Sequence, residues 1–193
     1  MQNKITSTSF YEIWKESVEA QQELLSDIWR KNPVYTSQIF SQDGILNAVA
    51  QKLQLFYYSN YYYLDAVFYK PEDIIKENEF WFRDIRIAFE HENNFRSGLY
   101  KEVSHLLTTN ADLKVLVSYP NGEINDELEY LHSIISKSRQ AKIISDDQSF
   151  LVILGYENEF EWQGWIYNDE EKWHLILENK ILPLKYYQHN KNP

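Results

Sequence analysis

Two glutamates flank a histidine where an apolar segment ends: Glu90 and Glu92 stand on either side of His91 in "IRIAFEHENN", residues 85–94. Residues i and i+2 of a strand point to the same face, so the two carboxylates share one face and His91 points to the other. Two anions at that spacing repel each other unless water, a cation or a metal lies between them. This pair is therefore the first candidate in the chain for metal-ion or acid–base chemistry.

Two further acids stand where apolar residues are expected. Asp65 interrupts "YYYLDAVFY", residues 61–69, and an aspartate there is costly to bury without a partner. Glu102 falls within the inward-facing stripe of a predicted helix over residues 95–108, so we expect it to point toward the sheet. Converging carboxylate oxygens suit Mg²⁺, Mn²⁺ or Ca²⁺, and such an ion lowers the pKa of a water and neutralises charge at a phosphodiester. The alternative is structural, with Asp65 paired to a lysine or arginine and the two strand-end glutamates in solvent.

The apolar periodicity of the whole chain predicts the elements that position these acids. Helical spacing favours helices, and an aromatic or β-branched run with a period of two favours strands. Helices are predicted over residues 9–31, 44–54, 95–108 and 124–140, and strands over 55–59, 61–69, 85–92, 113–119, 149–156, 161–167 and 172–178. A strand–helix–strand succession implies parallel pairing. The expected fold is therefore a mixed α/β fold, in which helices flank a central mixed β-sheet and a C-terminal β-hairpin completes it.

The order of the predicted elements resembles that of a known superfamily. A helix, a hairpin carrying one aspartate, a strand ending in acid-x-acid, a helix and a buried strand follow one another, as in the PD-(D/E)XK restriction-endonuclease-like superfamily. The resemblance covers about residues 44–120 and implies a core of αβββαβ topology. The N-terminal helix 9–31 and the C-terminal helix and strands 123–187 lie outside that core. Because no repeat or linker divides the chain, we expect a single domain over residues 1–193.

The resemblance also assigns roles to the four acids. In that superfamily the aspartate of the second strand and the acid of the third bind Mg²⁺. Asp65 matches the aspartate, although Leu64 replaces the preceding proline, and Glu90 matches the acid. Glu92 stands in the place of the lysine, where it completes the metal shell or orients the attacking water. The expected metal ligands and catalytic residues are thus Asp65, Glu90 and Glu92, with Mg²⁺ or Mn²⁺ as cofactor and Glu102 in support.

The function implied by the resemblance is a metal-dependent phosphodiesterase that cleaves nucleic acid. The alternative is a catalytically inactive domain of the same fold whose acidic surface binds a basic protein partner. The net charge of −10 argues against tight duplex binding, since a duplex would meet net repulsion away from the site. Candidates for phosphate contacts are "WRK", residues 29–31, and "SKSRQAK", residues 136–142, while exposed tyrosine and tryptophan rings could stack on bases.

Composition limits the remaining classes of protein. The chain of 193 residues contains no cysteine, which excludes disulfides and thiolate metal sites and is typical of a reducing compartment. Its apolar runs are too short to span a membrane, so we expect a soluble cytoplasmic protein with no membrane partner. No pattern determines the oligomeric state, although a dimer is compatible with it. Four histidines show no ligand spacing and are each predicted to be an ordinary helix-face or strand residue: His105, His132, His174 and His189.

Overall fold

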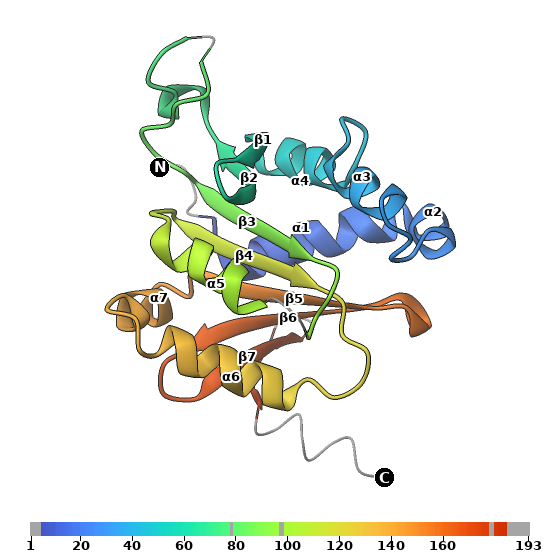
Figure 1. Ribbon diagram of the computed structural model, residues 1–193, viewed down its shortest axis with the longest axis vertical. Coiled ribbons are helices and arrows are strands. Elements are labelled where there is room, and N and C mark those ends of the chain that lie inside the picture. The colour runs from blue at the N-terminus through green and yellow to red at the C-terminus, as the bar shows by residue number, and fades with distance from the viewer. Residues whose placement is uncertain (1–4, 78, 97–98, 178–179, 185–193) are drawn as a thin grey trace.

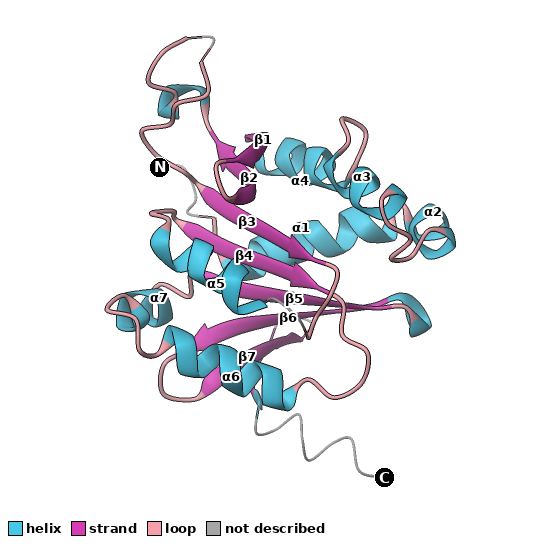
Figure 2. Cartoon of the chain, viewed as in Figure 1, coloured by secondary structure: helices cyan, strands magenta, loops and turns pink. Residues whose placement is uncertain are grey.

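The computed structural model contains an eight-stranded mixed β-sheet with helices on both of its faces (Figures 1 and 2). It describes residues 5–77, 79–96, 99–177 and 180–184, so His189 and the end of the predicted region 123–187 lie outside the described residues. The strands are β1 Phe56–Tyr61, β2 Leu64–Tyr69, β3 Ile87–Glu92, β4 Leu113–Ser118, β5 Phe150–Tyr156, β6 Glu161–Asn168, β7 Lys172–Leu177 and β8 Lys180–Pro183. The helices are α1 Ser7–Glu19, α2 Gln22–Asp27, α3 Val34–Phe40, α4 Ile45–Leu53, α5 Leu99–Thr108, α6 Asn125–Ile135 and α7 Ala141–Asp146, with 3₁₀ turns at Pro71–Asp73 and Asn158–Phe160.

The strands lie in the sheet in the same order as in the chain, from β1 to β8. β3, β4 and β5 are parallel to one another because a helical crossover returns the chain to the same end of the sheet after each strand. The neighbouring strands on either side pair antiparallel, including the C-terminal hairpin of β6 and β7. The predicted mixed sheet, its parallel centre and its closing hairpin are confirmed.

Side-chain alternation along β3 divides the interior into two cores. Phe89 belongs to a core rich in aromatic rings under α1, α3 and α4, whereas Ala88 belongs to a second core, with a larger share of aliphatic residues, under α5 and α6. In Figure 1, α5 and α6 cross in front of the sheet and α1 lies behind it. Glu90 has the same parity as Ala88, so its side chain lies on the α5 side. No helix of the described residues is long and apolar enough to cross a membrane.

The predicted continuous helix over residues 9–31 is wrong. α1 ends at Glu19, and Gln21 leaves the helical region with φ −119° and ψ 22° before α2 begins. A long-range contact accompanies this corner: Gln38 Nε2 of α3 donates to Gln21 Oε1 over 2.7 Å. Leu25 stays buried beyond the corner, which is why the helical apolar spacing continues through it in the sequence.

Other elements also differ from the prediction. The predicted helix 124–140 ends at Ile135, and a separate helix, α7, precedes β5. α3 and β8 were not predicted, since both are short and their apolar residues follow no long period. The segment that links β2 to β3 opens with a 3₁₀ turn at Pro71–Asp73. Hereafter this segment, which covers residues 70–86, is called the β2–β3 excursion.

Candidate metal centre

Asp65 and Glu90 meet across the antiparallel pair β2–β3. The register joins Ala66 to Phe89 and Val67 to Ala88, so one further step places Asp65 opposite Glu90. The two carboxyl groups lie close enough for each to change the pKa of the other. Asp65 Oδ2 also accepts a hydrogen bond from the backbone N–H of His91 over 2.8 Å. The sequence-predicted pair is thus brought together and held in a defined orientation.

α5 adds two side chains to this pair, Glu102 and His105. They stand three positions apart, so they share the face of α5 that covers the sheet. His105 Nδ1 lies 2.9 Å from Glu90 Oε1, and the side chain of His105 is 35% exposed. Glu102 Oε2 is buried and has no hydrogen-bond partner. An unsatisfied buried carboxylate oxygen is costly, and it marks a place where a cation would be stabilising.

Glu92 lies next to this group rather than in contact with it. Its side chain is partly exposed, and its Oε1 accepts a hydrogen bond from Asn94 N–H over 2.6 Å. Its negative charge nevertheless raises the pKa values of both Asp65 and Glu102. Within the described part of the chain, no three histidine, aspartate or glutamate side chains converge closely enough to ligate one ion together. The structure therefore joins Asp65 to Glu90 and leaves Glu92 and Glu102 at electrostatic range.

Burial, together with neighbouring negative charge, raises the pKa values of Asp65, Glu90 and Glu102. Burial raises the pKa of Glu90 to about 9, with further contributions from Asp65 and Glu102. Burial also raises the pKa of Asp65, opposed by its hydrogen bond from His91 N–H and by the neighbouring Glu90. At neutral pH Glu90 is therefore protonated. Among the described residues, no lysine or arginine forms an ion pair with any of the four acids. Within this part of the chain, the alternative that Asp65 is paired to a lysine or arginine is therefore wrong.

Carboxylate oxygens are the ligands that Mg²⁺ and Mn²⁺ prefer, and the two acids of this group that lie opposite each other are Asp65 and Glu90. The unpartnered oxygen of Glu102 lies at electrostatic range and does not converge with them on one ion position. A metal ion would compete for these carboxylates with protons and with His105, which contacts Glu90 Oε1. We call Asp65, Glu90, Glu92 and Glu102 the acid site.

His105 is the site residue that sequence reasoning missed, since it was predicted to be an ordinary helix-face residue. The spacing Glu102-x-x-His105 was the available signal, because it puts both side chains on one helix face. Tyr63, at the tip of the β1–β2 hairpin, packs against the His105 ring with centroids 5.0 Å apart. No local pattern indicates that contact, which depends on how α5 docks against β2 and β3.

The two predicted phosphate-contact segments fall at opposite ends of the sheet. Arg30, from the segment 29–31, donates from Nη2 to the carbonyl of Asn93 over 3.0 Å, just beyond the end of β3. The segment 136–142 lies between α6 and α7, where Gln140 Nε2 donates to the carbonyl of Leu107 near the far end of α5. Figure 1 shows α7 on the side from which β4 begins, away from the arrowhead of β3. Only the first segment can reach a ligand at the acid site.

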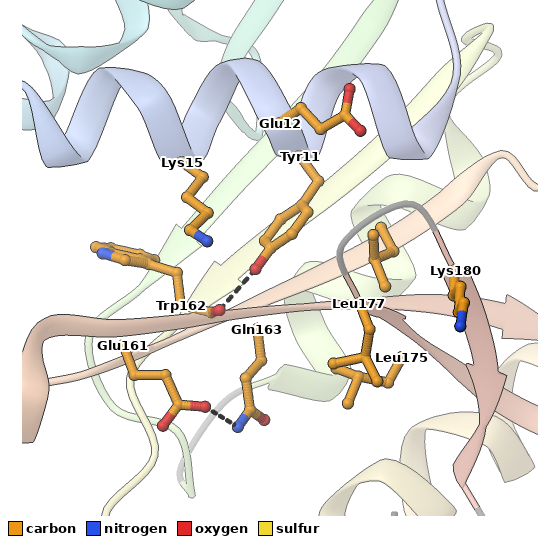
Figure 3. Close-up of a pocket in the computed structure, with 10 residues that line it drawn as sticks. Tyr11, Glu12, Lys15, Glu161, Trp162, Gln163, Leu175, Leu177 and Lys180 are labelled. Atoms are coloured by element: carbon orange, nitrogen blue, oxygen red, sulfur yellow. Dashed lines mark hydrogen bonds between the residues drawn. The ribbon is translucent and has the colours of Figure 1, made fainter.

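A cavity of about 740 Å³ lies elsewhere, between α1 and the strands β6 to β8 (Figure 3). Its apolar lining includes Trp162 and Leu175, and its charged lining includes Lys15 and Lys180. Tyr11 donates its hydroxyl hydrogen to the carbonyl of Trp162 over 2.6 Å, so this ring is held by the fold. Glu12 and Glu161 also line the cavity. The acid site is nevertheless the better candidate for chemistry, because its buried carboxyl groups have raised pKa values.

Comparison with protein-family models, with curated proteins and with solved structures finds no match to this chain. The residues of the acid site and their geometry therefore carry the functional conclusion by themselves.

Proposed function

We propose that this protein is a metal-dependent phosphodiesterase that cleaves nucleic acid, built on a restriction-endonuclease-like core. The observation that carries the proposal is the direct meeting of Asp65 and Glu90 beside the buried, unpartnered oxygen of Glu102, with no lysine or arginine of the described chain to neutralise them. The succession α4, β1, β2, β3, α5, β4 supports the proposal, since it has the αβββαβ order that the resemblance implies.

Each residue has a role that its contacts support. Asp65 and Glu90 would hold Mg²⁺ or Mn²⁺, with Asp65 oriented by the backbone N–H of His91. The ion, when bound, would neutralise charge on the phosphodiester and lower the pKa of a water. Glu92 is more exposed than Glu90 and is not in contact with Asp65 or Glu90, so its proposed role is to orient the attacking water. His105 positions Glu90 through the contact at Nδ1.

Cleavage of labelled DNA and RNA, single-stranded and duplex, in Mg²⁺ or Mn²⁺ tests this proposal. Asp65→Asn and Glu90→Gln should abolish metal-dependent cleavage, whereas His105→Ala should lower it roughly tenfold, as loss of a residue that orients a ligand does. Asp126→Asn, an exposed aspartate of α6, is the matched control and should cleave like the unmodified protein. Cleavage that persists at full rate in Asp65→Asn and Glu90→Gln would rule the acid site out as the catalytic centre.

A second candidate function is a non-catalytic domain that binds a basic protein partner. It is favoured by exposed rings beside the acid site, such as Tyr62 and Trp81, since such residues are enriched in protein interfaces. This candidate predicts metal-independent binding of basic proteins and no cleavage of any nucleic acid. The cleavage assay above therefore separates the two.

A further inference from the structure

Exposed aromatic rings are concentrated on one part of the molecule. Phe56, Tyr62, Tyr63, Phe80 and Trp81 are five of the seven exposed aromatic residues in the described chain, with Tyr100 and Tyr130 as the others. Tyr62 is 69% exposed, and Tyr63 and Trp81 are each 52% exposed. Solvent-exposed rings in a group mark interaction sites, because scattered single residues are the ordinary case. We call Tyr62, Tyr63, Phe80 and Trp81 the aromatic surface.

The β2–β3 excursion brings the two halves of this surface together. It folds back over β1 and β2, where the Phe82 ring packs on Tyr61 at 5.0 Å and on Tyr69 at 4.6 Å between centroids. Phe80 then stacks on Tyr58 at 4.2 Å with an interplanar angle of 19°. These rings, most of them partly buried, thus form a base that holds the exposed rings above it.

Tyr62 occupies an unfavourable backbone conformation for a tyrosine. Its φ is +55°, in the left-handed region where glycine or asparagine is the usual residue of a hairpin tip. Its ring is mostly exposed and contacts Trp81 at 6.0 Å between centroids, so little burial offsets the strain. Strain of this kind is typically retained at functional positions. The side chain of Tyr62 is therefore better explained by a ligand than by the turn.

The aromatic surface leads directly into the acid site. Tyr63 follows Tyr62 at the hairpin tip and packs on His105, whose Nδ1 lies 2.9 Å from Glu90 Oε1. Cationic side chains lie at the same end of the sheet: Arg30 beside the carbonyl of Asn93, and Lys101 in the first turn of α5. A ligand with flat rings and a phosphate backbone fits this succession of features.

We propose that the aromatic surface stacks on unpaired bases and delivers single-stranded nucleic acid to the acid site. This inference rests on the proposed phosphodiesterase function and specifies its substrate class. Stacking on aromatic side chains needs splayed bases, which a duplex does not offer. A duplex also carries one negative charge per about 1.7 Å of its axis, so a protein of net charge −10 repels it. Stacking of bases on aromatic rings depends less on neutralising phosphates, so it favours a single strand.

The test is binding of a labelled oligothymidylate by fluorescence anisotropy, in an Asp65→Asn background so that cleavage cannot intervene. Tyr62→Gly and Trp81→Ala should each weaken binding by about fivefold or more, the factor that ~1 kcal/mol of stacking gives. Tyr130→Ala removes an exposed ring from α6 and is the matched control, expected to bind unchanged. Tyr62→Gly should also keep or raise the melting temperature, because glycine tolerates the positive φ, so loss of binding cannot be ascribed to unfolding.

Three outcomes would overturn the inference. The first is an equal oligothymidylate affinity of the Asp65→Asn protein and of its three variants with Tyr62→Gly, Trp81→Ala or Tyr130→Ala. The second is that the unmodified protein binds and cleaves duplex in preference to single strands. That second result would leave the phosphodiesterase proposal intact. The third is self-association that Tyr62→Gly and Trp81→Ala abolish without any oligonucleotide binding, which would make the surface an interface between copies of this chain. Ring-dependent oligonucleotide binding without metal-dependent cleavage would instead contradict the phosphodiesterase proposal and retain the binding surface.

Discussion

Glu90 shows at the residue scale how burial and like-charged neighbours determine whether a carboxyl group is ionised. Its pKa is raised to about 9, whereas an unfolded glutamate titrates near about 4.3. Between these values the unfolded chain loses the proton and the folded chain keeps it. The contribution of Glu90 to stability is therefore fully present below the unfolded pKa and is lost as the pH rises through the folded one.

A pH series of urea unfolding checks this for the metal-free protein. The free energy of unfolding of the unmodified protein should fall relative to that of Glu90→Gln as the pH rises from about 5 to about 9, because glutamine cannot lose the proton. Parallel curves for the two proteins across this range would mean that Glu90 titrates as a solvated side chain.

The same scale separates what could be predicted in the acid site from what could not. Asp65 and Glu90 followed from local rules, because an acid in an apolar strand is conspicuous and alternation assigns its face. His105 and Tyr63 become site residues only when α5 docks over β2 and β3. The detachment of Glu92, which turns toward Asn94, also depends on the loop after β3 and not on strand parity.

At the element scale, the β2–β3 excursion is held by one buried ion pair. Asp73 is 1% exposed, and it accepts hydrogen bonds from Arg86 Nε over 2.8 Å, from Arg86 Nη2, and from the backbone N–H of Lys70 over 2.8 Å. This pair joins the start of the excursion to its end, so it closes the segment that carries Phe80 and Trp81.

Arg86→Met should destabilise the protein by about 3 kcal/mol, because it leaves the Asp73 carboxylate buried and unpaired. Asp112→Ala is the matched control: it removes the 3.3 Å contact to Arg86 Nη1 from a side chain that is 55% exposed, and it should cost less than about 1 kcal/mol. Urea unfolding of both variants measures the difference. Equal losses would mean that the excursion is held mainly by its aromatic contacts.

Helices and strands were predicted best where the spacing of apolar residues stays regular through one buried element. β3, β4 and β5 are buried along almost their whole length, and the helices predicted between them indicate a parallel centre. The corner at Gln21 could not be predicted in the same way, because the apolar spacing continues across it and the Gln21–Gln38 contact that accompanies it lies 17 residues apart in the chain.

At the scale of the whole molecule, the net charge of −10 limits how nucleic acid can be bound. Three cations lie near the end of β3 and the start of α5: Arg30, Arg96 and Lys101. Three phosphate contacts to a single strand give a slope of log K against log salt of about −2. Oligothymidylate affinity across a salt series should therefore show a slope of about −2 or shallower, and a slope near about −5 would contradict base stacking as the main source of affinity.

The central claim is that the acid site binds a divalent cation, and thermal unfolding with and without Mn²⁺ tests it most directly. A ligand that binds only the native state stabilises it by about 2.7 kcal/mol at one hundred times its Kd, which is roughly 5–10 °C for a domain of this size. The unmodified protein should show this rise. Asp65→Asn should lose it while remaining at least as stable without metal, because asparagine still accepts from His91 N–H and removes a buried negative charge that raises the pKa of Glu90. If Mn²⁺ changes neither melting temperature, and Asp65→Asn lowers the metal-free stability by several kcal/mol, Asp65 is a buried structural partner and the metal-dependent account is wrong.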